Sequence, residues 1–243
     1  SPYYIKLIGD KSLSQRDFER VISPLQKMGV NFKVNNKKTL PLKIKGSNFV
    51  NPIHYIEKRG SAQCKSTVML AALNSPGKTI IRAKKSRDHT ENIFKYLGIP
   101  IIIKKNKHYD EIKIKGQKYF KSFKYEVPSD PSSCAFFVVL TLLSKNCKLK
   151  IQNVNVNQSR IGYIELLNKM GAKIKIKNVK KKYGEKQADI YVKSQPVLKK
   201  INCPPKLNSN LIDEFLIIFL AAAKANGVSS FSNLSELNKK ESQ

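Results

Sequence analysis

The stretch SAQCKSTVMLAAL runs from Ser61 to Leu73, and a Gly-containing turn and a short apolar segment separate it from KKSRDHTENIFKYLG, Lys84 to Gly98. Each stretch begins with small polar residues and continues with apolar residues at helical spacing. We therefore expect two helices whose first turns present hydroxyl, amide and guanidinium groups beside free backbone N–H groups. Such helix N-termini bind anions such as phosphate. In the alternative interpretation, Ser61 and Ser86 only cap the two helices.

The composition is that of a folded globular protein. Of the 243 residues, 41% are hydrophobic, with 11 Gly and 11 Pro, so the chain can form one large domain or two ordinary ones. No apolar run is long enough to cross a bilayer, and the start, SPYYIKLIGD, has no signal-peptide core. We expect a cytosolic protein.

The cysteines and histidines lack the spacing of a metal site. Four widely spaced cysteines form no CxxC pair: Cys64, Cys134, Cys147 and Cys203. The first three adjoin apolar stretches, which favours buried reduced thiols over disulfides or zinc ligands. The three histidines are far apart, so we expect no metal site.

The net charge of +29 raises the question of a nucleic-acid partner. Only six of the 46 basic residues are Arg, and the Lys residues are scattered over nearly every segment instead of forming one stripe. We favour attraction of small anionic substrates as the use of this charge.

One order of elements recurs along the chain. From Ser61 the pattern predicts helix, strand, helix, strand and strand, and the order starts again with DPSSCAFFVVLTLL, Asp130 to Leu143. The segment DKSLSQRDFERVISPLQKMG repeats the later helix of the unit. We expect Asp10 or Ser12 to cap that helix, Arg16 to lie in its first turns and Gly29 to end it.

These repeats indicate an α/β or α+β fold of several pseudo-equivalent units. A (β/α) barrel is disfavoured because the strands come in unequal groups. In the segment VPSD, Pro128 would interrupt strand pairing. We therefore expect two domains, residues 1–127 and 128–243, that meet at a cleft where a ligand can bind.

The chain resembles the enolpyruvyl transferase family, and most closely its shikimate-pathway branch. The matching phrases come in the family's order: GDKSLSQRDFERVISPLQKMG, LPLKIKG, SAQCKS, SRDHTE, VPSDPSSCAFF, NQSRIGYIELLNKMGAKI, LIDEF and KKES. The resemblance implies a two-domain inside-out α/β barrel fold of βαβαββ units, with shikimate-3-phosphate bound in the first domain. It also implies an internal portion of a bacterial enzyme, which we expect to be inactive alone.

The implied activity is transfer of the enolpyruvyl group from phosphoenolpyruvate to the 5-hydroxyl of shikimate-3-phosphate, with release of phosphate. The resemblance implies no cofactor, these two substrates as partners, no nucleic acid or membrane, and a cytoplasmic monomer. Two carboxylates in different environments can share the proton transfers, and cationic groups can offset the substrate charges. Two alternatives stay open: a basic protein of this fold that binds a polyanion without catalysis, and the branch that acts on UDP-N-acetylglucosamine.

The resemblance also implies site residues, position by position. Ser61, Ala62 and Gln63 match contacts of shikimate-3-phosphate, and Gln63 also lies near the enolpyruvyl group in the family. Arg87 matches a basic residue of the same pocket, which Ser86 is expected to assist. Arg16 matches an Arg that contacts phosphoenolpyruvate. Asp213 in LIDEF matches an acid/base residue that acts at the 5-hydroxyl. Without the resemblance, the sequence pattern favours Asp213 as a helix N-cap. In KKES, Lys240 matches a shikimate-3-phosphate ligand and Glu241 a proton-transfer carboxylate.

Several positions depart from the family's usual residues. Asp17 stands where Pro is usual, and Ser129 stands where Gly is usual. The residues EKR precede GSAQ, where the family usually has apolar residues. Near the end, Asn238 replaces a frequent Arg and Gln243 an Asp.

Overall fold

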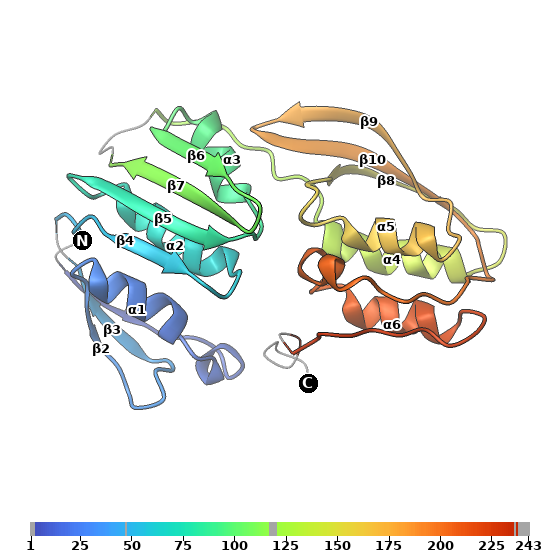
Figure 1. The fold of residues 1–243 in the computed structure, drawn as a ribbon, viewed down its shortest axis with the longest axis horizontal. Coiled ribbons are helices and arrows are strands. Elements are labelled where there is room, and N and C mark those ends of the chain that lie inside the picture. The colour runs from blue at the N-terminus through green and yellow to red at the C-terminus, as the bar shows by residue number, and fades with distance from the viewer. Residues whose placement is uncertain (1–2, 47, 117–120, 236, 238–243) are drawn as a thin grey trace. The chain divides into compact units, whose positions relative to one another are not determined.

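The computed structural model describes residues 3–46, 48–116, 121–235 and 237 (Figure 1). The chain divides into two compact units, Ser1–Phe123 and Lys124–Gln243. Both units combine helices with antiparallel or mixed sheets, which confirms the predicted mixture of α and β structure.

The described residues of the first unit form two sheets and three α-helices. Its elements are β1 (Tyr4–Leu7), η1 (Leu13–Gln15), α1 (Glu19–Lys27), β2 (Asn31–Lys33), β3 (Leu42–Lys45), β4 (His54–Glu57), α2 (Ala62–Ala72), β5 (Lys78–Lys84), α3 (His89–Tyr96), β6 (Ile101–Lys105) and β7 (Tyr109–Lys115). One sheet has the order β1-β3-β2 and the other β4-β5-β7-β6. All neighbouring strands are antiparallel except β4 and β5, which are parallel.

The second unit repeats the later part of the first. Its elements are α4 (Pro131–Leu143), β8 (Lys148–Asn155), α5 (Gly162–Lys169), β9 (Lys175–Lys182), β10 (Glu185–Lys193), η2 (Pro205–Asn210) and α6 (Phe215–Ala223). The sheet order β8-β10-β9 is antiparallel and matches β5-β7-β6. A parallel bridge between Ser129 and Val154 places the segment before α4 beside β8, as β4 lies beside β5. The predicted repeat is therefore confirmed.

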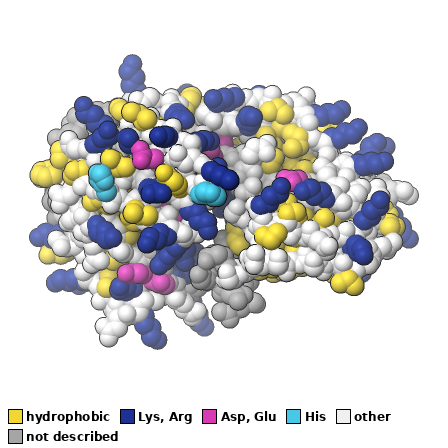
Figure 2. All heavy atoms as spheres, in the orientation of Figure 1, with side chains coloured by type: hydrophobic (Ala, Val, Ile, Leu, Met, Phe, Trp, Pro, Cys, Tyr) yellow, Lys and Arg dark blue, Asp and Glu magenta, His cyan; other side chains and the backbone are white. Residues whose placement is uncertain are grey.

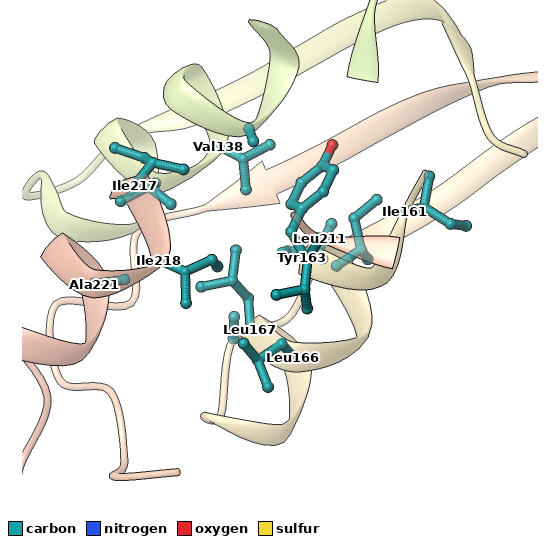
Figure 3. Close-up of a cluster of buried hydrophobic side chains, with 14 of the residues drawn as sticks. Val138, Ile161, Tyr163, Leu166, Leu167, Leu211, Ile217, Ile218 and Ala221 are labelled. Carbon is teal, nitrogen blue, oxygen red and sulfur yellow. The ribbon is translucent and has the colours of Figure 1, made fainter. Parts of the chain in front are cut away.

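Each unit has its own hydrophobic core. In the first unit, α2 buries Val68 and Met69 against Ile81, Ile112 and Ile114 of the mixed sheet. In the second unit, α4, α5 and α6 bury a larger cluster (Figure 3). Helix α6 is apolar all round, and its Phe215 and Ile218 are fully buried in this cluster.

The helix predicted from Asp10 starts later than expected. The Asp10 carboxylate accepts the N–H of Leu13 at 2.7 Å and so caps the short helix η1. Arg16 then adopts extended backbone (φ −75°, ψ 142°), and Asp17 accepts the N–H of Glu19 at 2.7 Å where α1 begins. The placement of Arg16 inside a helix was wrong because these two aspartates bind backbone N–H groups locally and divide the segment. The predicted end of α1 is confirmed, with Gly29 in the left-handed region at φ 89°.

All four cysteines are free, as predicted, but their burial differs from the expectation. Cys64, Cys134 and Cys203 are buried, whereas Cys147 is exposed in the turn between α4 and β8. Burial raises the pKa of the Cys134 thiol to about 11. That thiol therefore stays protonated and unreactive near neutral pH.

Lysines lie directly opposite one another on every sheet. The cross-strand pairs are Lys6–Lys43, Lys43–Lys33, Lys78–Lys115, Lys148–Lys193 and Lys181–Lys186. On the face shown in Figure 2, Lys and Arg side chains are likewise spread widely. The positive charge is therefore distributed over all three sheets and is not gathered into one patch.

Because opposed like charges destabilise a sheet, Lys43→Glu should stabilise the first unit. Lys43 pairs with Lys6 on one side and with Lys33 on the other. We expect the free energy of unfolding to rise by roughly 1 kcal/mol at low salt, with a smaller gain at about 0.5 M NaCl. Urea unfolding at the two salt concentrations measures this. Lys43→Gln is the control and should gain less, and an equal gain at both concentrations would contradict cross-strand repulsion.

Candidate functional site

The N-terminus of α2 retains donors for an anion. Ser61 is the N-cap residue, and its Oγ accepts the N–H of Cys64 at 3.3 Å. The cap predicted at Ser61 is therefore confirmed, and the hydroxyl can still donate its own hydrogen. The N–H groups of Ala62 and Gln63 have no acceptor within the helix. Capping by Ser61 and binding of an anion are thus compatible.

The loop that leads into α2 is held by Glu57. This buried residue ends β4, and its carboxylate accepts the N–H of Arg59 at 2.9 Å and the N–H of Gly60 at 2.7 Å. Gly60 has φ 75°, a conformation that favours glycine. Residues 57–59, the EKR segment that departs from the family's usual apolar residues, therefore supply the carboxylate that orders the loop before Ser61.

The second helix begins three residues later than Ser86. Helix α3 starts at His89, and the Asp88 carbonyl accepts the first N–H of the helix, from Asn92, at 3.0 Å. Both the helix start at Ser86 and its interpretation as a cap were wrong, and Ser86 and Arg87 lie in the preceding loop. Among the described residues, the buried Oγ of Ser86 has no hydrogen-bond partner. Such unsatisfied hydroxyls are rare, and a ligand would explain this one.

A buried lysine joins the two helix starts. Lys65 of α2 lies with its Nζ 2.5 Å from Oε1 of Glu91 in α3, and it donates to the carbonyl of Arg87 at 2.8 Å. Beside this pair, Oγ of Ser66 lies 2.6 Å from Oγ1 of Thr90. Burial raises the pKa of the Glu91 carboxyl, and the Lys65 ammonium offsets part of that rise. These contacts bring the first turn of α2 and the Ser86–Arg87 loop to one edge of the mixed sheet.

The other predicted site residues lie elsewhere in the chain. Arg16 is exposed in the segment between η1 and α1. Asp213 is exposed in the turn before α6 in the second unit, and Glu214, not Asp213, occupies the N-cap position. Lys240 and Glu241 fall outside the described residues. Within the described ranges, no group of three or more His, Cys, Asp and Glu side chains could hold a metal ion.

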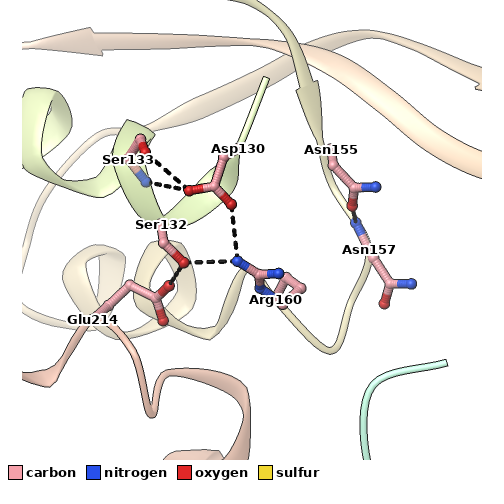
Figure 4. A network of polar contacts seen from close by, with 7 residues as sticks. All are labelled: Asp130, Ser132, Ser133, Asn155, Asn157, Arg160 and Glu214. Carbon is pink, nitrogen blue, oxygen red and sulfur yellow. Dashed lines mark hydrogen bonds and ion pairs between the residues drawn. The ribbon is translucent and has the colours of Figure 1, made fainter. Parts of the chain in front are cut away.

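A second polar cluster joins three segments of the second unit (Figure 4). Asp130 caps α4 by accepting the N–H of Ser133 at 2.8 Å, and its other oxygen lies 3.0 Å from Nη2 of Arg160. Arg160 also donates to Oγ of Ser132 at 2.7 Å, and Ser132 donates to the buried carboxylate of Glu214. The cluster therefore ties the starts of α4 and α6 to the loop before α5. No pattern in the sequence predicted a role for Ser132, Arg160 or Glu214.

Two solved structures that resemble the chain define the class of its fold. The enolpyruvyl transferase NikO from Streptomyces tendae superimposes with a TM-score of 0.66, covering 92% of this chain and 51% of that one, at 11% identity. An EPSP synthase structure from Acinetobacter baumannii reaches a TM-score of 0.81 at 34% identity and covers 97% of this chain and 53% of that one. The chain thus has the fold of an enolpyruvyl transferase.

Sequence comparison identifies the family within that class. A family model described as EPSP synthase (3-phosphoshikimate 1-carboxyvinyltransferase) matches residues 1–243. The chain belongs to the EPSP synthase family, which confirms the resemblance seen in the sequence.

The curated relatives carry the same description. The 3-phosphoshikimate 1-carboxyvinyltransferase of Ruthia magnifica subsp. Calyptogena magnifica is 43% identical over 238 residues, which cover 98% of this chain and 53% of that protein. The protein of that name from Zymomonas mobilis is 39% identical over 242 residues, covering 99% of this chain and 53% of its own length. The chain spans about half the length of the curated relatives it matches.

The length and composition of the helices bear on whether the chain can span a membrane. None of those in the described part of the chain combines the length and the apolar composition needed to cross a bilayer.

The Asp130 cluster predicts a pH-dependent contribution to stability. Burial alone would raise the pKa of the Asp130 carboxyl, but hydrogen bonds from Ser133 and the Arg160 guanidinium outweigh burial and hold that pKa below its usual value. A lowered native pKa stabilises the fold above the unfolded pKa, and this stability is lost as the pH falls through the native pKa.

Asp130→Asn should therefore lower the free energy of unfolding at pH 7 by about 1 kcal/mol, a modest value because half of the side chain is exposed. The difference from wild type should shrink as the pH falls below about 4. Urea unfolding across this range measures it. Glu165→Gln, which breaks the exposed pair with Lys169, is the control and should change stability little. A difference that is constant with pH would contradict the role of the Asp130 charge.

Proposed function

We propose that this chain contributes the shikimate-3-phosphate site of an enzyme that transfers the enolpyruvyl group of phosphoenolpyruvate to the 5-hydroxyl of that substrate. One observation carries the proposal. Lys65 of α2 contacts the Arg87 carbonyl and Glu91, and these contacts bring the first turn of α2 to the Ser86–Arg87 loop. Membership of the EPSP synthase family and the printed names of the relatives support the choice of substrates.

In the proposed site the phosphate of shikimate-3-phosphate lies at the N-terminus of α2. The N–H groups of Ala62 and Gln63 and the hydroxyl of Ser61 donate to its oxygens, and the helix dipole favours its charge. Ser86 donates its unpaired hydroxyl, and Arg87 supplies a cation that can contact two oxygens at once. Gln63, which is exposed, also reaches toward the enolpyruvyl group.

The proposed chemistry is an addition followed by an elimination. The 5-oxygen bonds to C2 of phosphoenolpyruvate while its proton leaves and C3 gains a proton, and the C2–O bond to phosphate then breaks as C3 loses a proton. We assign the two proton-transfer roles to Asp213 and Glu241, because two carboxylates in different environments can hold protons of different acidity. Arg16 contacts phosphoenolpyruvate and Lys240 contacts shikimate-3-phosphate in this proposal.

We further propose that residues 1–127 belong to the shikimate-3-phosphate-binding domain and that residues 128–243 belong to the second domain. The protein acts as a cytoplasmic monomer in this proposal. Four free cysteines agree with a reducing compartment. Because the opposed lysines are distributed over three sheets, we favour attraction of small anionic substrates over a dedicated polyanion-binding face.

Calorimetric titration of the 243-residue chain with shikimate-3-phosphate tests the proposal. We expect weak but measurable binding, which Arg87→Ala reduces about tenfold or more by removing a charged partner of the phosphate. Arg82→Ala is the matched control in the same unit. Its guanidinium lies 3.8 Å from the ring centroid of Tyr109, and its loss should leave the dissociation constant unchanged. No binding by a folded sample, or equal loss in both variants, would contradict the assignment of Arg87.

A further inference from the structure

We infer that Lys65 is a positioning residue, which holds the Ser86–Arg87 loop in place beside the N-terminus of α2. This inference rests on the proposed function, because the position of Arg87 matters for a phosphate bound there.

Lys65 is linked to both parts of the candidate site. Its backbone N–H donates to the carbonyl of Ser61 at 3.2 Å, in the first hydrogen bond of α2. Its Nζ donates to the carbonyl of Arg87 at 2.8 Å. One residue therefore connects the two segments that supply the anion donors, and its side chain is only 3% exposed.

The carboxylate of Glu91 lowers the free-energy cost of burying the Lys65 ammonium group. Its carboxylate lies 2.5 Å from Nζ, and its side chain is 4% exposed. Without this charge, an ammonium group at such a depth would be strongly disfavoured. The carboxylate thus neutralises the group that holds the Arg87 carbonyl.

The Lys65–Glu91 ion pair is not well suited to stabilising the fold, because its hydrogen-bonding groups are not all satisfied among the described residues. The second carboxylate oxygen of Glu91 is buried and has no hydrogen-bond partner in the described part of the chain. Buried ion pairs with unsatisfied atoms contribute little net stability, and apolar replacements of similar volume are often neutral or better. The contact that such a replacement cannot reproduce is the hydrogen bond to Arg87.

The neighbouring Ser66–Thr90 contact provides a matched comparison. These hydroxyls lie 2.6 Å apart and join the same two helices, one residue after Lys65 in α2 and one residue before Glu91 in α3. The hydrogen bond to the Arg87 carbonyl comes from Lys65. Removing them tests helix-to-helix packing without releasing the loop.

The test compares three variants of the full 243-residue chain. Lys65→Met alone leaves Glu91 buried and unpaired, so this single variant is expected to lose stability. The double variant Lys65→Met/Glu91→Leu removes both charges and should regain a thermal midpoint close to wild type. Ser66→Ala/Thr90→Val is the packing control. Calorimetry measures shikimate-3-phosphate binding, and hydrogen exchange measures the protection of residues 85–90.

If Lys65 positions the loop, the charge-free double variant will bind about tenfold or more weakly and exchange faster at 85–90 although it is stable. The Ser66/Thr90 control will bind within about twofold of wild type. A stable double variant whose exchange at 85–90 is unchanged would overturn the inference. If wild type does not bind while exchange at 85–90 still rises in the double variant, the proposed function fails and the positioning role stands.

Discussion

The parallel pairing of β4 with β5 is the constraint on which the candidate site depends. Because α2 returns the chain to the same edge, the loops that follow both strands emerge side by side. A carboxylate at the end of β4 orders the first loop, and a lysine one turn into α2 reaches the second. Contacts from β4 and α2 therefore order both loops at this edge of the sheet.

The order of helices and strands could be predicted from the sequence because apolar periodicity records which face of each element is buried. Helix starts were less predictable. In the segment from Asp10 to Glu19, two aspartates bind nearby N–H groups and divide one apparent helix into a short turn and a longer helix. At Ser86, the apparent cap belongs to a loop held by a residue 21 positions earlier in the chain, Lys65.

Polar contacts between distant segments could not be predicted from spacing. Arg160 meets Asp130 and Ser132, and Ser132 meets Glu214, across separations of 28 to 82 residues. Only the cap formed by Asp130 has a local signal, since Ser133 follows it by three residues. The resemblance located the phrases that contain these residues but not their contacts. The same limit applied to Lys65, which looks like an ordinary surface lysine in the sequence.

The four thiols differ in burial, so their rates of chemical labelling can follow the unfolding of the chain. Cys147 is exposed, so a thiol reagent can modify it in the native protein. Cys64 is enclosed in the first unit, whereas Cys134 and Cys203 are enclosed in the second. Each of these enclosed thiols becomes accessible only when its surroundings open. The order in which they are labelled therefore distinguishes the opening of one unit from the opening of the other, without any engineered probe.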